Sequence, residues 1–186
     1  MKQIPNIFTL LNLFFGCVAI IYIIQPGLVP VFRQVNPDYL GAGINNDGTQ
    51  YISIPEQAVI GSVLIGAAAV VDFLDGFVAR LFKATSEIGK QLDSLADVVS
   101  FGVAPGMIMF ELLRMSWAQQ PGGLDTSMLW LLPSFLVPCA AGYRLARFNT
   151  EPSSESGFTG LPSPAAGLLV ASLPLVYWSS RVTWVT

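Results

Sequence analysis

The stretch AVIGSVLIGAAAVVDFLDGFVARLFKATSEIGKQLDSLAD, residues 58–97, decides the fold of this chain. It opens with an apolar run that ends at the first acid, Asp72. This run is too short for a helix to cross about 30 Å of hydrocarbon. Asp72 and Asp75 are therefore expected at membrane depth, near one boundary of the bilayer. An ionised carboxylate is costly there unless it is paired, so its presence indicates a functional site.

The composition outside this stretch also points to a membrane. Of 186 residues, 53% are hydrophobic and 11% are charged, whereas a soluble domain carries about 25% charged residues. We predict an all-α integral membrane protein, a polytopic helical bundle that forms a single membrane domain over residues 1–186. The five expected spans are 8–24, 58–82, 95–115, 128–145 and 165–182.

The polar segment 25–57 separates the first two spans. It contains the turn sequence Asn45-Asn46-Asp47-Gly48, followed by Tyr51-Ile52-Ser53-Ile54. This pattern predicts a short hairpin or loop outside the membrane.

The distribution of Lys and Arg predicts the orientation. With the N-terminus inside, six basic residues lie at cytoplasmic helix ends and three lie outside, as the positive-inside rule favours. The inner six are Lys2, Arg80, Lys83, Lys90, Arg144 and Arg147, and the outer three are Arg33, Arg114 and Arg181. The net charge of −3 gives no reason to expect a nucleic-acid partner.

Helical spacing gathers the acids into two stripes. Asp72, Asp75, Gly76 and Ala79 are spaced i, i+3, i+4 and i+7, so they share one helix face. Gly89, Asp93 and Asp97 repeat at intervals of four on the next helix. Because the link over residues 81–86 is short, the two helices should be antiparallel neighbours whose four carboxylates converge.

An all-oxygen cluster suits a hard divalent cation such as Mg²⁺ or Mn²⁺. The chain has no histidine, which excludes imidazole ligands and His-based catalysis. The alternative is that each acid is an ion-paired residue at a helix end, and Arg80, Lys83 and Lys90 are near enough in sequence to pair with them. Taken one residue at a time, both interpretations stand.

Eight positions together carry more information than any one acid. Asp72, Asp75, Gly76, Ala79, Arg80, Gly89, Asp93 and Asp97 match the pattern D-x2-D-G-x2-A-R-x8-G-x3-D-x3-D at every fixed position. The sequence here resembles the CDP-alcohol phosphatidyltransferase family, whose signature this is. The resemblance extends over most of the chain except the 25–57 segment.

The resemblance implies roles for these residues. Two metal ions, Mg²⁺ or Mn²⁺, would be bridged by Asp72 and Asp93, with Asp75 and Asp97 each completing one shell. Asp97 would also be the catalytic base that accepts the proton of the acceptor hydroxyl. The CDP-lipid would contact Gly76, Ala79, Arg80, Ser86 and Gly89.

Three further stretches narrow the resemblance. PNIFTLLN over residues 5–12, DSLADVVSFGVAP over 93–105 and FTGLPSPAA over 158–166 look like the membrane-integral phosphatidylserine synthases. The implied reaction joins CDP-diacylglycerol and L-serine, giving phosphatidylserine and CMP. A sibling enzyme acting on glycerol 3-phosphate or inositol phosphate is the first alternative, and a cation-transport or structural membrane protein is the second.

For the acceptor, the cations best placed to receive a carboxylate are Arg144 and Arg147, with Asn149 beyond them. Both arginines fit equally well as topology anchors.

The family usually has six spans, but only 22 residues follow Pro164, enough for one helix. We therefore expect either a fragment or a chain without the last helix, with its C-terminus outside. By resemblance, the protein would lie in a bacterial or archaeal cytoplasmic membrane with its active site near the cytoplasmic face. Its partners would be membrane lipid, both substrates and a second copy in a homodimer.

The orientation predicts a labelling result. In a chain whose Cys17 and Cys139 are replaced, a single cysteine at Ser154 should resist an impermeant thiol reagent added to intact cells, because the loop faces the cytoplasm. Permeabilised cells provide the positive control, since the reagent should label them. Labelling of intact cells would invert the orientation.

Overall fold

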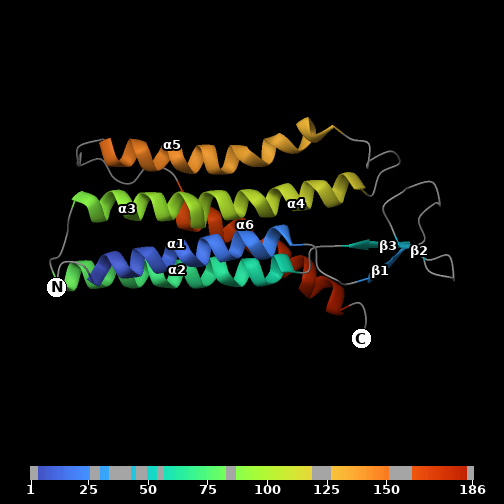
Figure 1. The fold of residues 1–186 in the computed structure, drawn as a ribbon, viewed down its shortest axis with the longest axis horizontal. Coiled ribbons are helices and arrows are strands. Elements are labelled where there is room, and N and C mark those ends of the chain that lie inside the picture. Colours follow the sequence, from blue (N-terminus) through green and yellow to red (C-terminus); the bar gives the residue numbers. More distant parts are fainter. Residues whose placement is uncertain are drawn as a thin grey trace.

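The computed structural model describes residues 4–25, 30–33, 43–44, 50–53, 57–82, 87–118, 127–150 and 161–183. Its helices run antiparallel in a bundle, and three short strands lie beyond one end (Figure 1). The elements are α1 (Ile4–Ile24), β1 (Pro30–Arg33), β2 (Gly43–Ile44), β3 (Gln50–Ser53), α2 (Gln57–Phe82), α3 (Glu87–Asp97), η1 (Val98–Val103), α4 (Ala104–Ala118), η3 (Met128–Phe135), α5 (Leu136–Thr150) and α6 (Ser163–Thr183).

Four helical segments are long and apolar enough to cross a membrane. They cover Asn6–Ile24, Gln57–Leu81, Glu87–Trp117 and Met128–Thr150. The fifth expected span corresponds to α6, whose apolar part Ser163–Tyr177 is shorter. The predicted helical membrane bundle is thus confirmed.

Two spans differ from the sequence prediction in their extent. The third begins at Glu87 rather than near residue 95, because the polar helix α3 continues through η1 into the apolar α4 without a break. Polar side chains fill most of α3, so a search for apolar runs misses it. The fourth begins as the 3-10 helix η3, which contains Pro133, and becomes α-helical only from Leu136.

The expected hairpin is present as part of a small sheet. Strands β2 and β3 pair antiparallel, with Gly43 opposite Tyr51 and Ile44 opposite Gln50, and β1 pairs with the other edge of β3. The predicted turn over residues 45–48 lies outside the described residues. The sheet is at the opposite end of the bundle from the end of α2 and the start of α3 (Figure 1).

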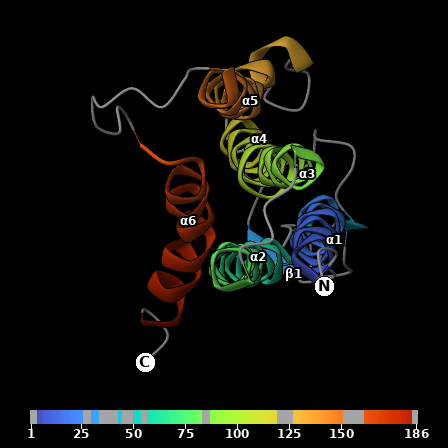
Figure 2. The same cartoon turned by 90° about the vertical axis from the view of Figure 1, so that its left-hand side faces the viewer.

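Helix α1 connects the two acid-bearing helices. It packs along α2 and also contacts α3, η1 and α4, whereas the described parts of α2 and α3 make few direct contacts with each other. Seen along the bundle, α1 and α2 form one layer, α3 and α4 the next, and α5 the outermost, with α6 crossing beside α2 (Figure 2). The two acid-bearing helices are antiparallel as predicted, but α1 is what joins them.

The apolar core lies between α1, α2, η1, α4 and α6. Ile23, Ile65, Phe101 and Ile108 are almost fully buried, and small residues let the helices approach. At Gly167 of α6 the close approach is to backbone, because an added Cβ atom would lie 2.9 Å from backbone atoms of Phe101. Backbone cannot move aside as a side chain can, so this glycine fixes where α6 docks.

Gly167→Ala should therefore lower the free energy of unfolding of the detergent-purified protein by about 1–3 kcal/mol, the usual cost of overpacking, and its melting temperature with it. The matched control is Gly142→Ala in α5, where an added Cβ meets nothing within 4 Å. It should stabilise the helix slightly, by up to ~1 kcal/mol. Equal melting temperatures for the two variants would contradict the packing seen at Phe101.

Candidate functional site

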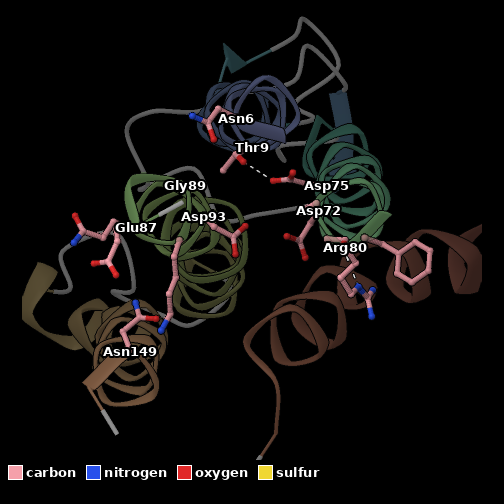
Figure 3. A pocket seen from close by; sticks show the side chains of 14 residues that line it. Asn6, Thr9, Asp72, Asp75, Arg80, Glu87, Gly89, Asp93 and Asn149 are labelled. Carbon is pink, nitrogen blue, oxygen red and sulfur yellow. Dashed lines mark hydrogen bonds between the residues drawn. The ribbon is translucent and has the colours of Figure 1, made fainter. Parts of the chain in front are cut away.

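A pocket of about 840 Å³ lies at the end of the bundle where α2 ends and α3 begins. Side chains from four helices, α1, α2, α3 and α5, surround it (Figure 3). The lining residues are Asn6, Thr9, Asp72, Phe73, Asp75, Gly76, Ala79, Arg80, Glu87, Gly89, Lys90, Gln91, Asp93 and Asn149. Its volume is in the range of small-molecule and cofactor sites.

Three carboxylates converge beside this pocket. Asp72 of α2 and Asp93 and Asp97 of α3 each offer an oxygen atom, and these atoms all lie within 4.8 Å of one another. Figure 3 shows the Asp72 and Asp93 side chains pointing toward each other across the space between their helices. Of the four acids predicted to converge, three form this group, since residues four apart on α3 reach the same point on α2.

Asp75 lies outside this group of three. Its Oδ2 atom accepts a hydrogen bond from the Thr9 hydroxyl of α1, drawn as a dashed line in Figure 3. Its Oδ1 atom is buried and has no hydrogen-bond partner. Asp75 therefore keeps one carboxylate oxygen available to a ligand.

Asp97 sits deeper than the pocket lining. It is only 8% exposed, and it lies one helical turn beyond Asp93. The amide of Asn12 in α1 donates a hydrogen bond of 3.4 Å to its Oδ1 atom. Asp97 thus joins the cluster with Asp72 and Asp93 from the buried side of the pocket.

None of the four carboxylates forms an ion pair with a described Lys or Arg residue. Among the described residues, Arg114 and Glu111 form an ion pair at 2.8 Å, both of them on α4. The alternative of ion-paired helix ends is therefore not what this part of the chain shows. Clustered carboxylates without a cation would repel one another strongly at low dielectric. Their oxygens, including the orphaned Asp75 Oδ1, form a donor set that fits a hard divalent cation.

Four of the five residues expected to contact the CDP-lipid line the pocket: Gly76, Ala79, Arg80 and Gly89. The fifth, Ser86, lies outside the described residues. A Cβ atom added at Gly76 would meet nothing within 4 Å, so the pocket reaches the helix backbone there. The Arg80 Nε atom donates to the Gly76 carbonyl at 2.9 Å, and the exposed guanidinium lies on the α6 side of α2 (Figure 3).

Of the three residues expected to contact the acceptor, one lines the pocket and two do not. Asn149 lines the pocket, and its amide donates to the Ser94 hydroxyl at 2.7 Å, which docks the end of α5 on α3. Arg144 instead donates to the Ser163 hydroxyl at 2.7 Å, at the start of α6. Neither Arg144 nor Arg147 is among the lining residues.

Residues of α1 are the part of the site that the sequence prediction did not assign. Asn6 and Thr9 line the pocket, and Asn12 lies behind it. Their spacing of three places polar side chains on one face of an otherwise apolar span, a signal that is readable from the sequence. In the sequence prediction, these three residues appear only within the stretch over 5–12 that carries the family resemblance.

If Asp72, Asp93 and Asp97 hold the cation, Asp72→Asn or Asp93→Asn should abolish Mn²⁺ binding and turnover, because each removes a charged ligand from the cluster. Mn²⁺ affinity would be measured calorimetrically on the purified protein. Glu87→Gln, an exposed acid of the same pocket outside the cluster, is the matched control and should bind Mn²⁺ normally. Binding and activity within a few-fold of the parent in both Asp variants would exclude a metal site here.

Relatives of known name share much of this sequence. The CDP-diacylglycerol–serine O-phosphatidyltransferase of Helicobacter pylori (strain J99) is 33% identical over 168 residues, which cover 89% of this chain and 54% of that protein. The enzyme of that name from Mycobacterium leprae is 37% identical over 126 residues, 64% of this chain and 38% of that protein. The one from Saccharomyces cerevisiae is 42% identical over 111 residues, 55% of this chain and 36% of that protein.

The chain thus spans between about a third and about half of the length of these relatives. The sequence model of the CDP-alcohol phosphatidyltransferase family matches residues 2–186, nearly the whole chain. The eight signature residues, the acidic cluster that they build and this match agree. The chain belongs to the CDP-alcohol phosphatidyltransferase family.

Proposed function

We propose that this protein transfers a phosphatidyl group from CDP-diacylglycerol to the hydroxyl of L-serine, releasing CMP. The observation that carries the proposal is the group of three carboxylates, whose oxygens lie within 4.8 Å of one another at the edge of a pocket that signature residues line. The names of the relatives support serine as the acceptor.

The reaction replaces the phosphoanhydride linkage of CDP-diacylglycerol with a phosphate ester of serine. A bond forms between the serine hydroxyl oxygen and the lipid-borne phosphorus, and the bond from that phosphorus to the oxygen of CMP breaks. The hydroxyl proton must go to a base, and the leaving CMP carries away the electron pair. Catalysis then consists of holding the two substrates in line and stabilising charge on the phosphate oxygens.

Asp97 is the residue we assign as the base. It is buried, it reaches the cluster from the interior side, and Asn12 is its hydrogen-bond donor. A carboxylate in this place can accept the proton as the serine oxygen attacks. When bound, Mg²⁺ or Mn²⁺, proposed as two ions, would supply positive charge to the pyrophosphate, and Asp72, Asp75, Asp93 and Asp97 would hold the ions.

The CDP portion would occupy the open side of the pocket. Gly76 leaves the α2 backbone accessible there, and Ala79 and Gly89 are small enough to let a ligand lie close. Arg80 is exposed and can turn its guanidinium to phosphate oxygens. Lys90 of α3 lines the same pocket and adds a second cation. Ser86 belongs to this proposed contact set by the family resemblance alone.

The charge of the pocket favours serine over phosphate-bearing acceptors. Among its described lining residues, Arg80 and Lys90 are the cations, and the pyrophosphate of the CDP-lipid already needs both. Glycerol 3-phosphate or inositol phosphate would bring a further phosphate into a pocket that Asp72, Asp75, Asp93 and Glu87 also line. Asn149 offers a polar side chain that suits a small amino-acid acceptor.

Orientation, compartment and assembly complete the proposal. The ends of α2 and α5 and the start of α3, which carry Arg80, Arg147 and Lys90, lie at one end of the bundle (Figure 1). By the positive-inside rule, this end would face the cytoplasm, and the membrane would be the cytoplasmic membrane of a bacterium or archaeon. A homodimer remains a prediction of the family resemblance.

The test is CMP release from CDP-diacylglycerol by the purified protein with Mn²⁺. We expect release with L-serine and none with glycerol 3-phosphate or inositol phosphate. Asp97→Asn should lower the transfer rate by about 10²- to 10⁴-fold, the usual contribution of a general base, with CDP-diacylglycerol binding nearly intact.

The matched control for Asp97→Asn is Glu111→Gln, a buried acid on α4 about 20 Å farther along the same continuous helical span. It should retain transfer. CMP release driven by glycerol 3-phosphate and not by serine would refute the acceptor while leaving the family in place. A near-normal rate in Asp97→Asn would move the base to another residue.

A further inference from the structure

One face of α1 is buried from Thr9 to Ile23 and changes from polar to apolar along the way. Thr9, Asn12, Gly16, Ala19 and Ile23 are all buried, at intervals of three or four residues. The half toward the sheet is apolar, as a core stripe should be. The half at the carboxylate end contains a hydroxyl and an amide that are 2% and 0% exposed. Polar groups buried in a membrane span need a partner that accounts for them.

The partners are two of the four carboxylates, Asp75 and Asp97. Thr9 donates to Asp75 Oδ2, and Asn12 donates to Asp97 Oδ1. Asp72 and Asp93 receive no hydrogen bond from the described part of α1. One helix thus contacts an acid of α2 and an acid of α3 with two donors three residues apart.

Asn12 also lies at a close contact between α1 and η1. The Ser100 hydroxyl in η1 donates to the backbone carbonyl of Asn12 at 3.1 Å. One turn along α1, Gly16 lies so near that an added Cβ would be 2.4 Å from the Ser100 hydroxyl oxygen. Segment η1 is a π-helix that begins directly after Asp97. Such single-turn π-helices often occur at functional sites.

Each of the two hydrogen bonds uses one carboxylate oxygen and leaves the other. Asp75 keeps Oδ1, which is buried and has no partner, and Asp97 keeps Oδ2. Without the donors, both carboxylates could rotate about their side-chain torsions, because no described cation holds them. Partners of this kind orient metal ligands in other proteins, and their loss typically weakens metal affinity 10- to 100-fold.

We propose that Thr9 and Asn12 are positioning residues, which hold Asp75 and Asp97 so that one oxygen of each is presented to a divalent cation. This proposal rests on the metal site of the proposed function. It assigns α1 a role in assembling that site, although α1 itself contributes no carboxylate.

The test measures Mn²⁺ affinity calorimetrically on the full chain purified in detergent. Thr9→Val keeps the shape of the side chain and removes the hydrogen-bond donor. Asn12→Leu likewise keeps the branched shape of the side chain and removes its donor. Each variant should bind Mn²⁺ about 10- to 100-fold more weakly than the parent. Thr9→Ser keeps the hydroxyl and should restore affinity to within a few-fold of the parent.

Ser100→Ala is the matched control for helix packing. It removes a hydrogen bond between α1 and η1 at the same residue, Asn12, without touching a carboxylate. It should leave the Mn²⁺ affinity within a few-fold of the parent, even if it lowers the melting temperature. The proposal is overturned if Thr9→Val and Asn12→Leu bind Mn²⁺ like the parent, or if Ser100→Ala weakens binding as much as they do.

The outcome is separable from that of the proposed function. A parent that binds Mn²⁺ more tightly than Thr9→Val and Asn12→Leu, but releases no CMP with serine, would support positioning and refute the activity. A parent that releases CMP, with all variants equal in Mn²⁺ affinity, would refute positioning and leave the activity. A parent that binds no Mn²⁺ would overturn both.

Discussion

The repulsion among carboxylates held at membrane depth is the constraint on which the structure depends. Asp72, Asp93 and Asp97 bring oxygen atoms within 4.8 Å of one another, with no described Lys or Arg paired to them. Helices that carry such facing stripes cannot pack directly against each other, and α2 and α3 indeed make few contacts. Space is left between them at one end of the bundle, and that space is the pocket. The pocket therefore lies where the acids of α2 and α3 face each other.

Helix α1 stabilises this arrangement through both of its halves. Its apolar half packs with Ile65, Phe101 and Ile108 to form the core, and its polar half meets the acids. Glycines set how near the helices come: Gly16 brings α1 against η1, and Gly167 brings α6 against Phe101. The rigid contacts thus lie directly behind the carboxylates, where a ligand set must be held in place. The pocket side of Gly76, in contrast, is open.

The arrangement also relates the chemistry to the membrane. Asp97 is buried between the helices, while Arg80, Glu87 and Lys90 are exposed at the end of the bundle. The CDP-lipid of the proposed reaction has a charged head and apolar chains, and it would need both surroundings at once. The exposed apolar side chains on α2, such as Phe73 and Phe77, adjoin the acids along the same helix and suit contact with acyl chains.

Local sequence was enough to determine the helical membrane class, the existence of the five helices and the two acid stripes, because length, hydropathy and a period near four residues are local properties. The specific spacing of Asp72 to Asp97 also determined the family. The spacing of Gly89, Asp93 and Asp97 placed them on a helix, but the expected third span began only near residue 95, because no apolar signal marks the polar start from Glu87. Only the tertiary structure decided that Asn149 reaches the pocket while Arg144 turns to Ser163, since that depends on where α5 meets α3 and α6. It likewise decided that Thr9 and Asn12 meet Asp75 and Asp97, residues 66 and 85 positions away, because such contacts arise from helix packing and not from local spacing.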